Sequence, residues 1–200
     1  MLGQIELHLT AQAHSAAAAA AALDAAVREL QGALGRSIYS VDGRGLEAVV
    51  GGLLRAKGLT LAVAESCTGG LIASRLTDIA GSSDYVERGV VCYSNRSKVE
   101  LLGVPEAMIA AHGAVSEPVA RAKAEGIRTR AGTDAGVGVT GIAGPTGGSP
   151  EKPVGTVAIA VAIGDAVRVR TVRFFGDREQ IKFQAAQAAL NMLRLMLEAG

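Results

Sequence analysis

The sequence predicts a three-layer α/β/α domain with a mixed, mostly parallel β-sheet, preceded by a small N-terminal β-α-β piece. Apolar runs of strand length alternate with helical segments from Leu46 onward, which is typical of a parallel sheet covered by helices. Two of these runs, 154–163 and 167–174, are separated by a tight turn at Gly164-Asp165, so we expect an antiparallel hairpin. Hydrophobic residues make up 49% of the chain but aromatic residues only 3%, so the core must be built from Ala, Val, Leu and Ile.

The length and charge of the chain exclude several classes of protein. Two hundred residues suit one domain of about 150 residues with an additional piece. A net charge of +1 gives no basic field for nucleic acid or anionic lipid, and no run reaches the roughly 18 apolar residues of a membrane helix. The N-terminus lacks a signal-peptide pattern, and Cys67 and Cys92 form neither a disulfide framework nor a metal cluster. We expect a soluble cytoplasmic protein without a metal or cofactor.

Residues 1–45 differ from the rest of the chain. Polar and apolar residues alternate over 4–10, as in a half-buried strand, and the alanine-rich segment that follows predicts a helix from about Ala13 to Leu34. A short second strand is expected at 38–41. A β-α-β piece of this size is too small to be stable alone, so we expect it to pack on something else.

The main domain is expected to span residues 46–200. Its first helix, 46–57, carries an apolar stripe and stops at Gly58, and a buried strand follows at 59–64. Asp177 is suited to cap the last helix. In chain order, the remaining elements are a helix at 69–77, a strand at 88–93, a helix at 116–131, a strand at 135–140, the hairpin of 154–174 and a helix at 178–198.

The segment 65–70, Glu-Ser-Cys-Thr-Gly-Gly, lies where a buried strand turns into a helix. Ligands of open α/β sheets bind at this end of the strands. Ser66 is therefore a candidate nucleophile, with backbone N–H groups near Gly69 and Gly70 as an oxyanion hole. The alternative is that Ser66 and Thr68 merely cap the helix.

A serine nucleophile needs a base. His112, the only histidine of the main domain, reads as the last turn of a short helix and is poorly suited to this role. A lysine with a lowered pKa can serve instead, and Lys98, which follows the strand ending at Tyr93, is the best candidate. Arg96 could help to lower its pKa; the alternative is a solvated loop lysine. Cys67 is either a second possible nucleophile or a buried thiol.

Glycines and basic residues gather further along the chain. Eight of the 26 glycines fall between Gly132 and Gly155, flanked by strands, which favours a loop that approaches a ligand over a mere series of turns. Thr140 closes a strand at the same sheet edge, and Lys152 and Arg178 add positive charge. The sequence therefore predicts a serine-centred pocket that can bind an anion.

Taken together, these motifs resemble the CinA C-terminal domain, the nicotinamide-nucleotide amidohydrolase (PncC) family. The ordered set covers about Gly58 to Glu198 and is more specific than any single motif. The matching stretches are 64–70, 78–83, 93–95 with Lys98, 112–116, 141–145, 147–148, 152–156 and 176–178.

The resemblance implies a fold like the class II synthetase anticodon-binding domains, with five strands, and the hydrolysis of nicotinamide mononucleotide (NMN) to nicotinate mononucleotide and ammonia. It implies Ser66 as nucleophile, Lys98 as general base, Tyr93 as a further catalytic residue, and a homodimer. The substrate contacts that we predict are Glu65, Thr68, Gly69, Gly70, Asn95, Thr140, Gly141, Gly144 and Arg178.

Residues 1–45 resemble part of the KH-like middle domain of CinA proteins. They contain no Gly-x-x-Gly clamp and no basic run, so we expect no nucleic-acid partner. Two other functions stay open. The domain could be a non-catalytic nucleotide-binding or interaction module, or an amidase that acts on a different substrate.

Overall fold

The computed structural model describes residues 4–199, in which five strands form one sheet in the order β2-β1-β3-β4-β5. β1 pairs in parallel with β2 and β3, whereas β4 is antiparallel to both β3 and β5. One strand of five therefore runs against the others, which confirms the predicted mixed, mostly parallel sheet with its hairpin. The strands are β1 Leu61–Glu65, β2 Val86–Val91, β3 Ala135–Gly141, β4 Thr156–Ile163 and β5 Ala166–Arg173.

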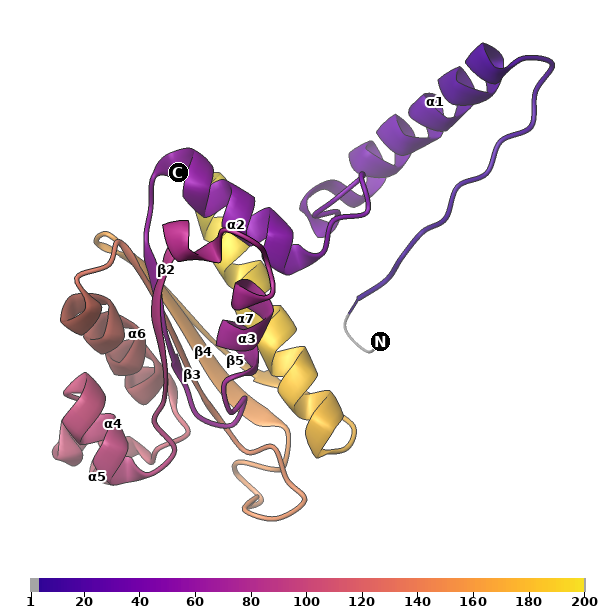
Figure 1. Ribbon diagram of the computed structural model, residues 1–200. Helices are drawn as coiled ribbons and strands as arrows, with labels where there is room; N and C mark the ends of the chain where they lie inside the picture. The colour runs from indigo at the N-terminus through magenta and orange to yellow at the C-terminus, as the bar shows by residue number, and fades with distance from the viewer. Residues whose placement is uncertain (1–3, 200) are drawn as a thin grey trace.

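Helices cover both faces of this sheet (Figure 1). α2, α3 and α7 pack on one face over the larger apolar cluster, and α4, α5 and α6 cover the other. Tyr85 is the one aromatic side chain buried among residues 4–199, so the predicted aliphatic core is confirmed. The helices are α1 Ala16–Leu34, α2 Leu46–Lys57, α3 Leu71–Thr77, α4 Asn95–Leu102, α5 Glu106–His112, α6 Glu117–Ala131 and α7 Arg178–Ala199, with short 3₁₀ turns η1 Gly35–Ser37 and η2 Ser82–Asp84.

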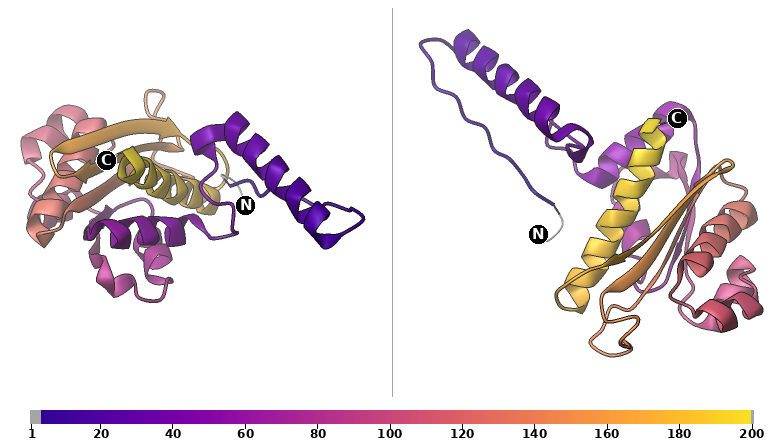
Figure 2. Two further views of the ribbon diagram at one scale, coloured as in Figure 1. Left: turned by 90° about the horizontal axis from the view of Figure 1, so that it is seen from above. Right: turned by 180° about the vertical axis from the view of Figure 1, so that it is seen from behind.

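The N-terminal piece forms its helix but not its two strands. α1 projects away from the body of the domain and has no buried residue (Figures 1 and 2). Residues 4–10 run without a strand partner, with Ile5 85% exposed, and 38–41 also form no strand. A strand requires a neighbouring strand for its hydrogen bonds, and within residues 4–199 neither stretch pairs with another strand. Both strand predictions are therefore wrong for the described chain.

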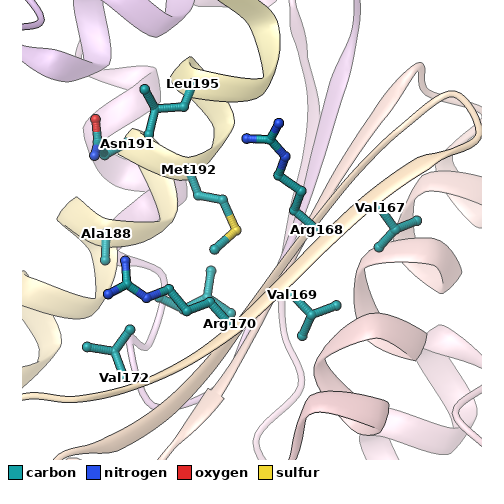
Figure 3. A pocket seen from close by; sticks show the side chains of 10 residues that line it. Val167, Arg168, Val169, Arg170, Val172, Ala188, Asn191, Met192 and Leu195 are labelled. Carbon is teal, nitrogen blue, oxygen red and sulfur yellow. The ribbon is translucent and has the colours of Figure 1, made fainter. Parts of the chain in front are cut away.

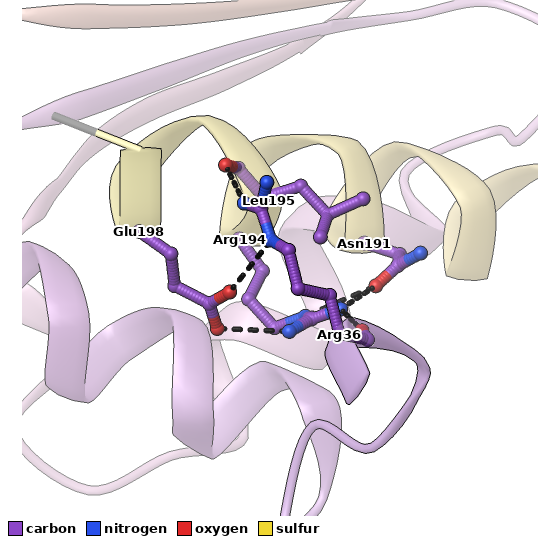
Figure 4. A network of polar contacts seen from close by, with 5 residues as sticks. All are labelled: Arg36, Asn191, Arg194, Leu195 and Glu198. Atoms are coloured by element: carbon purple, nitrogen blue, oxygen red, sulfur yellow. Dashed lines mark hydrogen bonds and ion pairs between the residues drawn. The ribbon is translucent and has the colours of Figure 1, made fainter. Parts of the chain in front are cut away.

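A polar network at the C-terminal end of α7 holds the segment that follows α1 (Figure 4). The Arg194 guanidinium donates to the Arg36 carbonyl at 2.6 Å, while the Arg36 side chain donates in return to the Leu195 carbonyl. Glu198 accepts from Arg194 at 2.8 Å, and Asn191 accepts from it as well. The buried Arg194 thus finds partners for its donors and fixes η1 on the body.

Glycines allow the helices on the α6 side to lie unusually close to the sheet. A Cβ atom added to Gly136 of β3 would stand 2.2 Å from the Ala124 carbonyl oxygen of α6. A Cβ added to Gly126 of α6 would stand 2.1 Å from the Leu102 carbonyl oxygen of α4. Part of the predicted glycine cluster therefore serves contact between helix and sheet rather than contact with a ligand.

No helix in the described range 4–199 is long and apolar enough to cross a membrane. Within the same range, no group of three or more His, Cys, Asp and Glu side chains is arranged to hold a metal ion.

We expect Gly126→Ala to destabilise the domain by about 1–3 kcal/mol, because the new methyl group must displace the backbone of α4. Gly52→Ala is the matched control, since Gly52 also lies inside a helix and its added Cβ would meet only Arg44 Nη1 at 3.9 Å. There alanine should stabilise the helix by up to about 1 kcal/mol. The free energy of unfolding in urea measures both; equal changes in the two variants would contradict the close approach of α4 and α6.

Candidate active site

The ends of four strands bring the predicted site residues to one edge of the sheet. β1, β2, β3 and β5 point the same way, so the segments after their carboxyl ends meet there. Between them lies a cavity of about 190 Å³, the Ser66 cavity. It is lined by Ser66, Cys67, Tyr93, Asn95, Lys98, Ala114, Val115, Thr140, Gly141, Ala143 and Arg178.

Seven of the predicted site residues thus line one cavity: Ser66, Tyr93, Asn95, Lys98, Thr140, Gly141 and Arg178. Five others do not line it: Glu65, Thr68, Gly69, Gly70 and Gly144. The predicted substrate contacts of this second group stay predictions, and the turn after β1 shows what several of these residues contact in the structure.

A larger hollow of about 550 Å³ lies elsewhere, between β5 and α7 (Figure 3). Arg168 and Arg170 point into it from the edge strand, opposite Met192 and Leu195 of the helix. None of the predicted site residues lines it. The smaller cavity is the candidate site because the nucleophile and base candidates meet there.

Glu65 caps α3 and contacts no ligand space. Its carboxylate accepts hydrogen bonds from the backbone N–H groups of Gly70 (3.0 Å), Ile72 (3.1 Å) and Ala73 (2.9 Å). A negative charge at a helix N-terminus is stabilised by the free N–H groups and by the helix dipole. The predicted substrate contact of Glu65 stays a prediction; in the structure the residue fixes the turn that follows β1.

Within this turn Ser66 is only 7% exposed, and its hydroxyl forms no hydrogen bond with any group of residues 4–199. The Gly69 N–H donates to the Ser66 carbonyl at 3.1 Å, and the Gly70 N–H is taken by Glu65. Both donors are already occupied, so the predicted oxyanion hole near these two glycines stays a prediction that would need other N–H groups of the turn. The alternative in which Ser66 and Thr68 cap α3 is wrong, since Glu65 does so.

Two other donors of the turn remain. The N–H groups of Cys67 and Thr68 lie beside the Cys67 sulfur and donate to no oxygen in the described part of the chain. Oxyanion holes are commonly built from backbone N–H groups that no other acceptor occupies. The Thr68 hydroxyl is fully buried and lacks a hydrogen-bond partner among residues 4–199.

Lys98 lies on α4 and is only 2% exposed, so the solvated-loop alternative is wrong. Its Nζ donates to the carbonyls of Tyr93 at 2.8 Å and Ser94 at 3.3 Å. Two acceptors satisfy the two N–H groups of a neutral amine and leave its lone pair free. Burial lowers the pKa of Lys98 below its ordinary value. Arg96 plays no part in this, since it extends from α4 toward Glu100 at the surface.

The two cysteines behave as buried thiols. Burial raises the pKa of Cys67 to about 11, so its sulfur stays protonated at neutral pH and is a poor nucleophile. Cys92 is also buried, and its sulfur donates to the Glu65 carbonyl at 3.1 Å. Of the two candidate nucleophiles in the turn, the structure favours the Ser66 hydroxyl.

Arg178 lies at the mouth of the cavity. Its guanidinium donates to the Gly144 carbonyl at 2.7 Å and to the Tyr93 hydroxyl at 3.2 Å. The Gly144 carbonyl thus positions the Arg178 guanidinium, and Gly144 itself does not line the cavity. Thr140 donates to the Ala114 carbonyl at 2.8 Å. Lys152, which was expected to add positive charge near the site, does not line the cavity. Its ammonium donates to the carbonyl of His112 at the end of α5.

Sequence reasoning missed Lys123, which lies on α6 with 0% exposure and donates to the Val139 carbonyl. Burial lowers its pKa to about 8. Its position could have been found from the helical period, since the buried Val119 and Ile127 lie four residues before and after it. A lysine in the middle of the apolar face of a helix indicates that its side chain is buried.

Comparison with known proteins gives one consistent result. A family model described as the CinA C-terminal domain matches residues 44–197. A CinA-like protein of Syntrophus aciditrophicus is 52% identical over 98% of this chain, and a putative competence-damage inducible protein of Moorella thermoacetica is also 52% identical over 98% of it. The alignments cover 47% and 48% of these relatives, so the chain spans about half the length of the curated relatives it matches.

Solved structures agree. The competence/damage inducible protein CihA of Agrobacterium tumefaciens is 42% identical, with a TM-score of 0.74 over 76% of this chain and 93% of that one. A competence-damaged protein (CinA) superfamily protein of Klebsiella pneumoniae is 36% identical, with a TM-score of 0.75 over 78% of this chain and 97% of that one.

We expect Glu65→Gln to lower both stability and any activity of the Ser66 cavity. The amide offers one acceptor oxygen where the carboxylate offers two, and its NH₂ group faces N–H donors, so the free energy of unfolding should fall by about 1–3 kcal/mol. Displacement of the turn should reduce kcat by roughly tenfold or more. Glu100→Gln is the control, because Glu100 pairs only with Arg96 at the surface. Equal stability of the two variants would refute the capping role.

Proposed function

The chain belongs to the CinA C-terminal domain family, and on that premise we propose that it hydrolyses the carboxamide of nicotinamide mononucleotide to nicotinate mononucleotide and ammonia. Ser66 is the nucleophile and Lys98 the general base. One observation carries the proposal: an unpartnered serine hydroxyl and a buried lysine amine line the same small cavity. The predicted homodimer and the KH-like assignment of residues 1–45 stay predictions that rest on the family resemblance.

The proposed reaction is an acyl transfer in two stages. The neutral Lys98 amine takes the Ser66 proton while Ser66 Oγ attacks the carboxamide carbon. The N–H groups of Cys67 and Thr68 stabilise the negative oxygen. Lys98 then returns the proton to the amide nitrogen, the C–N bond breaks and ammonia leaves. Water, deprotonated by Lys98, hydrolyses the acyl-enzyme to the carboxylate and restores the serine.

The size and charge of the site support a nucleotide substrate. A cavity of about 190 Å³ is smaller than the roughly 300 Å³ at which pockets enclose a whole ligand, so only the carboxamide ring enters it. The ribose phosphate then extends past Tyr93, which is 61% exposed, toward the Arg178 guanidinium. No carboxylate of residues 4–199 forms an ion pair with Arg178, so its charge is available to the phosphate.

The direct test is ammonia release from NMN. We expect Ser66→Ala to lose at least about three orders of magnitude in kcat, because the acyl-enzyme cannot form. Ser74→Ala, which removes an exposed serine of α3, is the control and should keep full activity. Undiminished turnover by Ser66→Ala would sink the serine assignment. Saturable NMN binding without turnover by the wild type would favour the binding module, and equal efficiency on free nicotinamide would favour a different amidase.

The pH dependence tests the base. Only the neutral amine of Lys98 accepts a proton, so kcat/KM should rise with pH until Lys98 is deprotonated. Because burial lowers the pKa of Lys98, the midpoint of this rise should lie below the value of about 10.4 for a free lysine. Lys98→Arg should be inactive at every pH tested, since a guanidinium does not lose its proton. An active Lys98→Arg variant would exclude Lys98 as the base.

A further inference from the structure

The hollow between β5 and α7 has no part in the proposed reaction. Its volume of about 550 Å³ lies within the roughly 300–1,000 Å³ of pockets that hold small molecules. Because β5 is the outer strand of the sheet, one wall of the hollow is a strand without a further neighbour, and the other wall is α7 (Figure 3). The hollow shares no lining residue with the Ser66 cavity, so a molecule bound in it would occupy a second site.

The strand wall of the hollow carries arginines where packing against α7 would favour apolar side chains. Successive side chains of a strand point to opposite faces of the sheet. On β5, Val167 and Val169 pack against the alanine cluster on the α6 side. The alternate residues Arg168 and Arg170 point toward α7 (Figure 3). The opposite wall is apolar over most of its length, with the α7 side chains Ala188, Met192 and Leu195.

The charges of the two arginines have no partner within residues 4–199. No carboxylate in this range forms an ion pair with Arg168 or Arg170. The one polar side chain that α7 contributes to the hollow is Asn191, whose oxygen already accepts two hydrogen bonds from Arg194, at 3.0 and 2.8 Å. What Asn191 has left to offer is its NH₂ group. The polar side chains that line the hollow therefore offer hydrogen-bond donors only.

Donors on one wall and apolar groups on the other define the class of ligand. A guanidinium binds phosphate and carboxylate groups through paired, charge-assisted hydrogen bonds. Methionine and leucine side chains favour contact with apolar and aromatic groups. Since the whole chain has a net charge of only +1, the positive charge of the hollow is a local feature of β5.

We propose that the hollow is a binding site for a small amphipathic anion. The acidic group of the ligand, a phosphate or a carboxylate, lies on the guanidiniums of Arg168 and Arg170, and its apolar body lies on Met192 and Leu195. The inference goes beyond the proposed function and does not rest on it.

Arginines on an outer strand have a second role, which predicts the opposite result. Charged side chains that point inward from such a strand prevent edge-to-edge pairing of sheets, and the methylene groups of arginine cover apolar surface by themselves. In that case Arg168 and Arg170 fill the hollow and no ligand binds. A binding measurement separates the two roles.

The test is a fluorescence titration of the full chain with 8-anilinonaphthalene-1-sulfonate, an anion with an aromatic body. The wild type should bind this probe saturably. Arg168→Gln and Arg170→Gln should each weaken binding by about tenfold or more, because a charged hydrogen-bond donor to the sulfonate is lost, and the double variant should abolish it.

Two further titrations test the acidic group of the ligand. N-phenyl-1-naphthylamine has the same rings without the sulfonate, so it should bind more weakly than the anion and should not distinguish the variants. At constant ionic strength, inorganic phosphate or acetate should compete with the anionic probe, and the stronger competitor identifies the acidic group that the hollow prefers.

Arg173→Gln is the matched control. Arg173 belongs to the same strand, but its guanidinium lies 5.2 Å from the centre of the Phe175 ring and does not line the hollow. Arg178→Gln tests whether the probe enters the Ser66 cavity instead. Neither substitution should change the dissociation constant of the probe. Arg168 and Arg170 are exposed, so the test variants should fold as the controls do.

Absence of saturable binding by the wild type would overturn the inference, as would equal affinity of the wild type and the Arg168→Gln/Arg170→Gln double variant. A loss of binding in Arg178→Gln alone would place the probe in the Ser66 cavity and would also overturn it. None of these measurements involves NMN. The proposed function can therefore fail while the hollow binds the probe, and the reverse.

Discussion

The geometry of the site depends on the three hydrogen bonds that the Glu65 carboxylate accepts at the start of α3. These bonds hold the helix against the end of β1, and the chain between them has to turn sharply. The N–H groups of Gly69 and Gly70 donate to acceptors within that turn. The backbone N–H groups left next to the serine are therefore those of Cys67 and Thr68. One buried carboxylate thus decides which N–H groups of the turn are occupied and which are left without an oxygen acceptor.

The cavity beside this turn is lined by basic side chains and by no carboxylate. Lys98 of α4 and Arg178 at the start of α7 both line the cavity, whereas Lys123 of α6 is buried in the fold. The acidic group nearest in sequence to the serine, Glu65, directs its charge into the helix instead. Cationic side chains without neighbouring carboxylates give a cavity a positive field, which favours anions.

The sheet, its hairpin and the meeting of Ser66 with Lys98 could be predicted from the sequence, because apolar runs define the strands and parallel strands bring their carboxyl ends together. The hydrogen-bond partners of the turn after β1 could not, since they depend on which N–H groups Glu65 occupies. Residues 4–10 show the limit of local pattern: alternation predicts a strand, but pairing requires a neighbour. Lys123 was visible as a lysine at core spacing in α6, yet its acceptor, the Val139 carbonyl of β3, is known only from the packing of α6 on the sheet.

The network around Arg194 has a mechanical consequence. α7 is 22 residues long, or about 33 Å, and carries Arg194 near one end and Arg178 at the other. Arg194 binds the segment that follows α1, and Arg178 holds Tyr93 and Gly144 at the cavity mouth. A force on the projecting α1 would therefore be transmitted by one continuous helix, α7, to the entrance of the cavity at the opposite end of the domain.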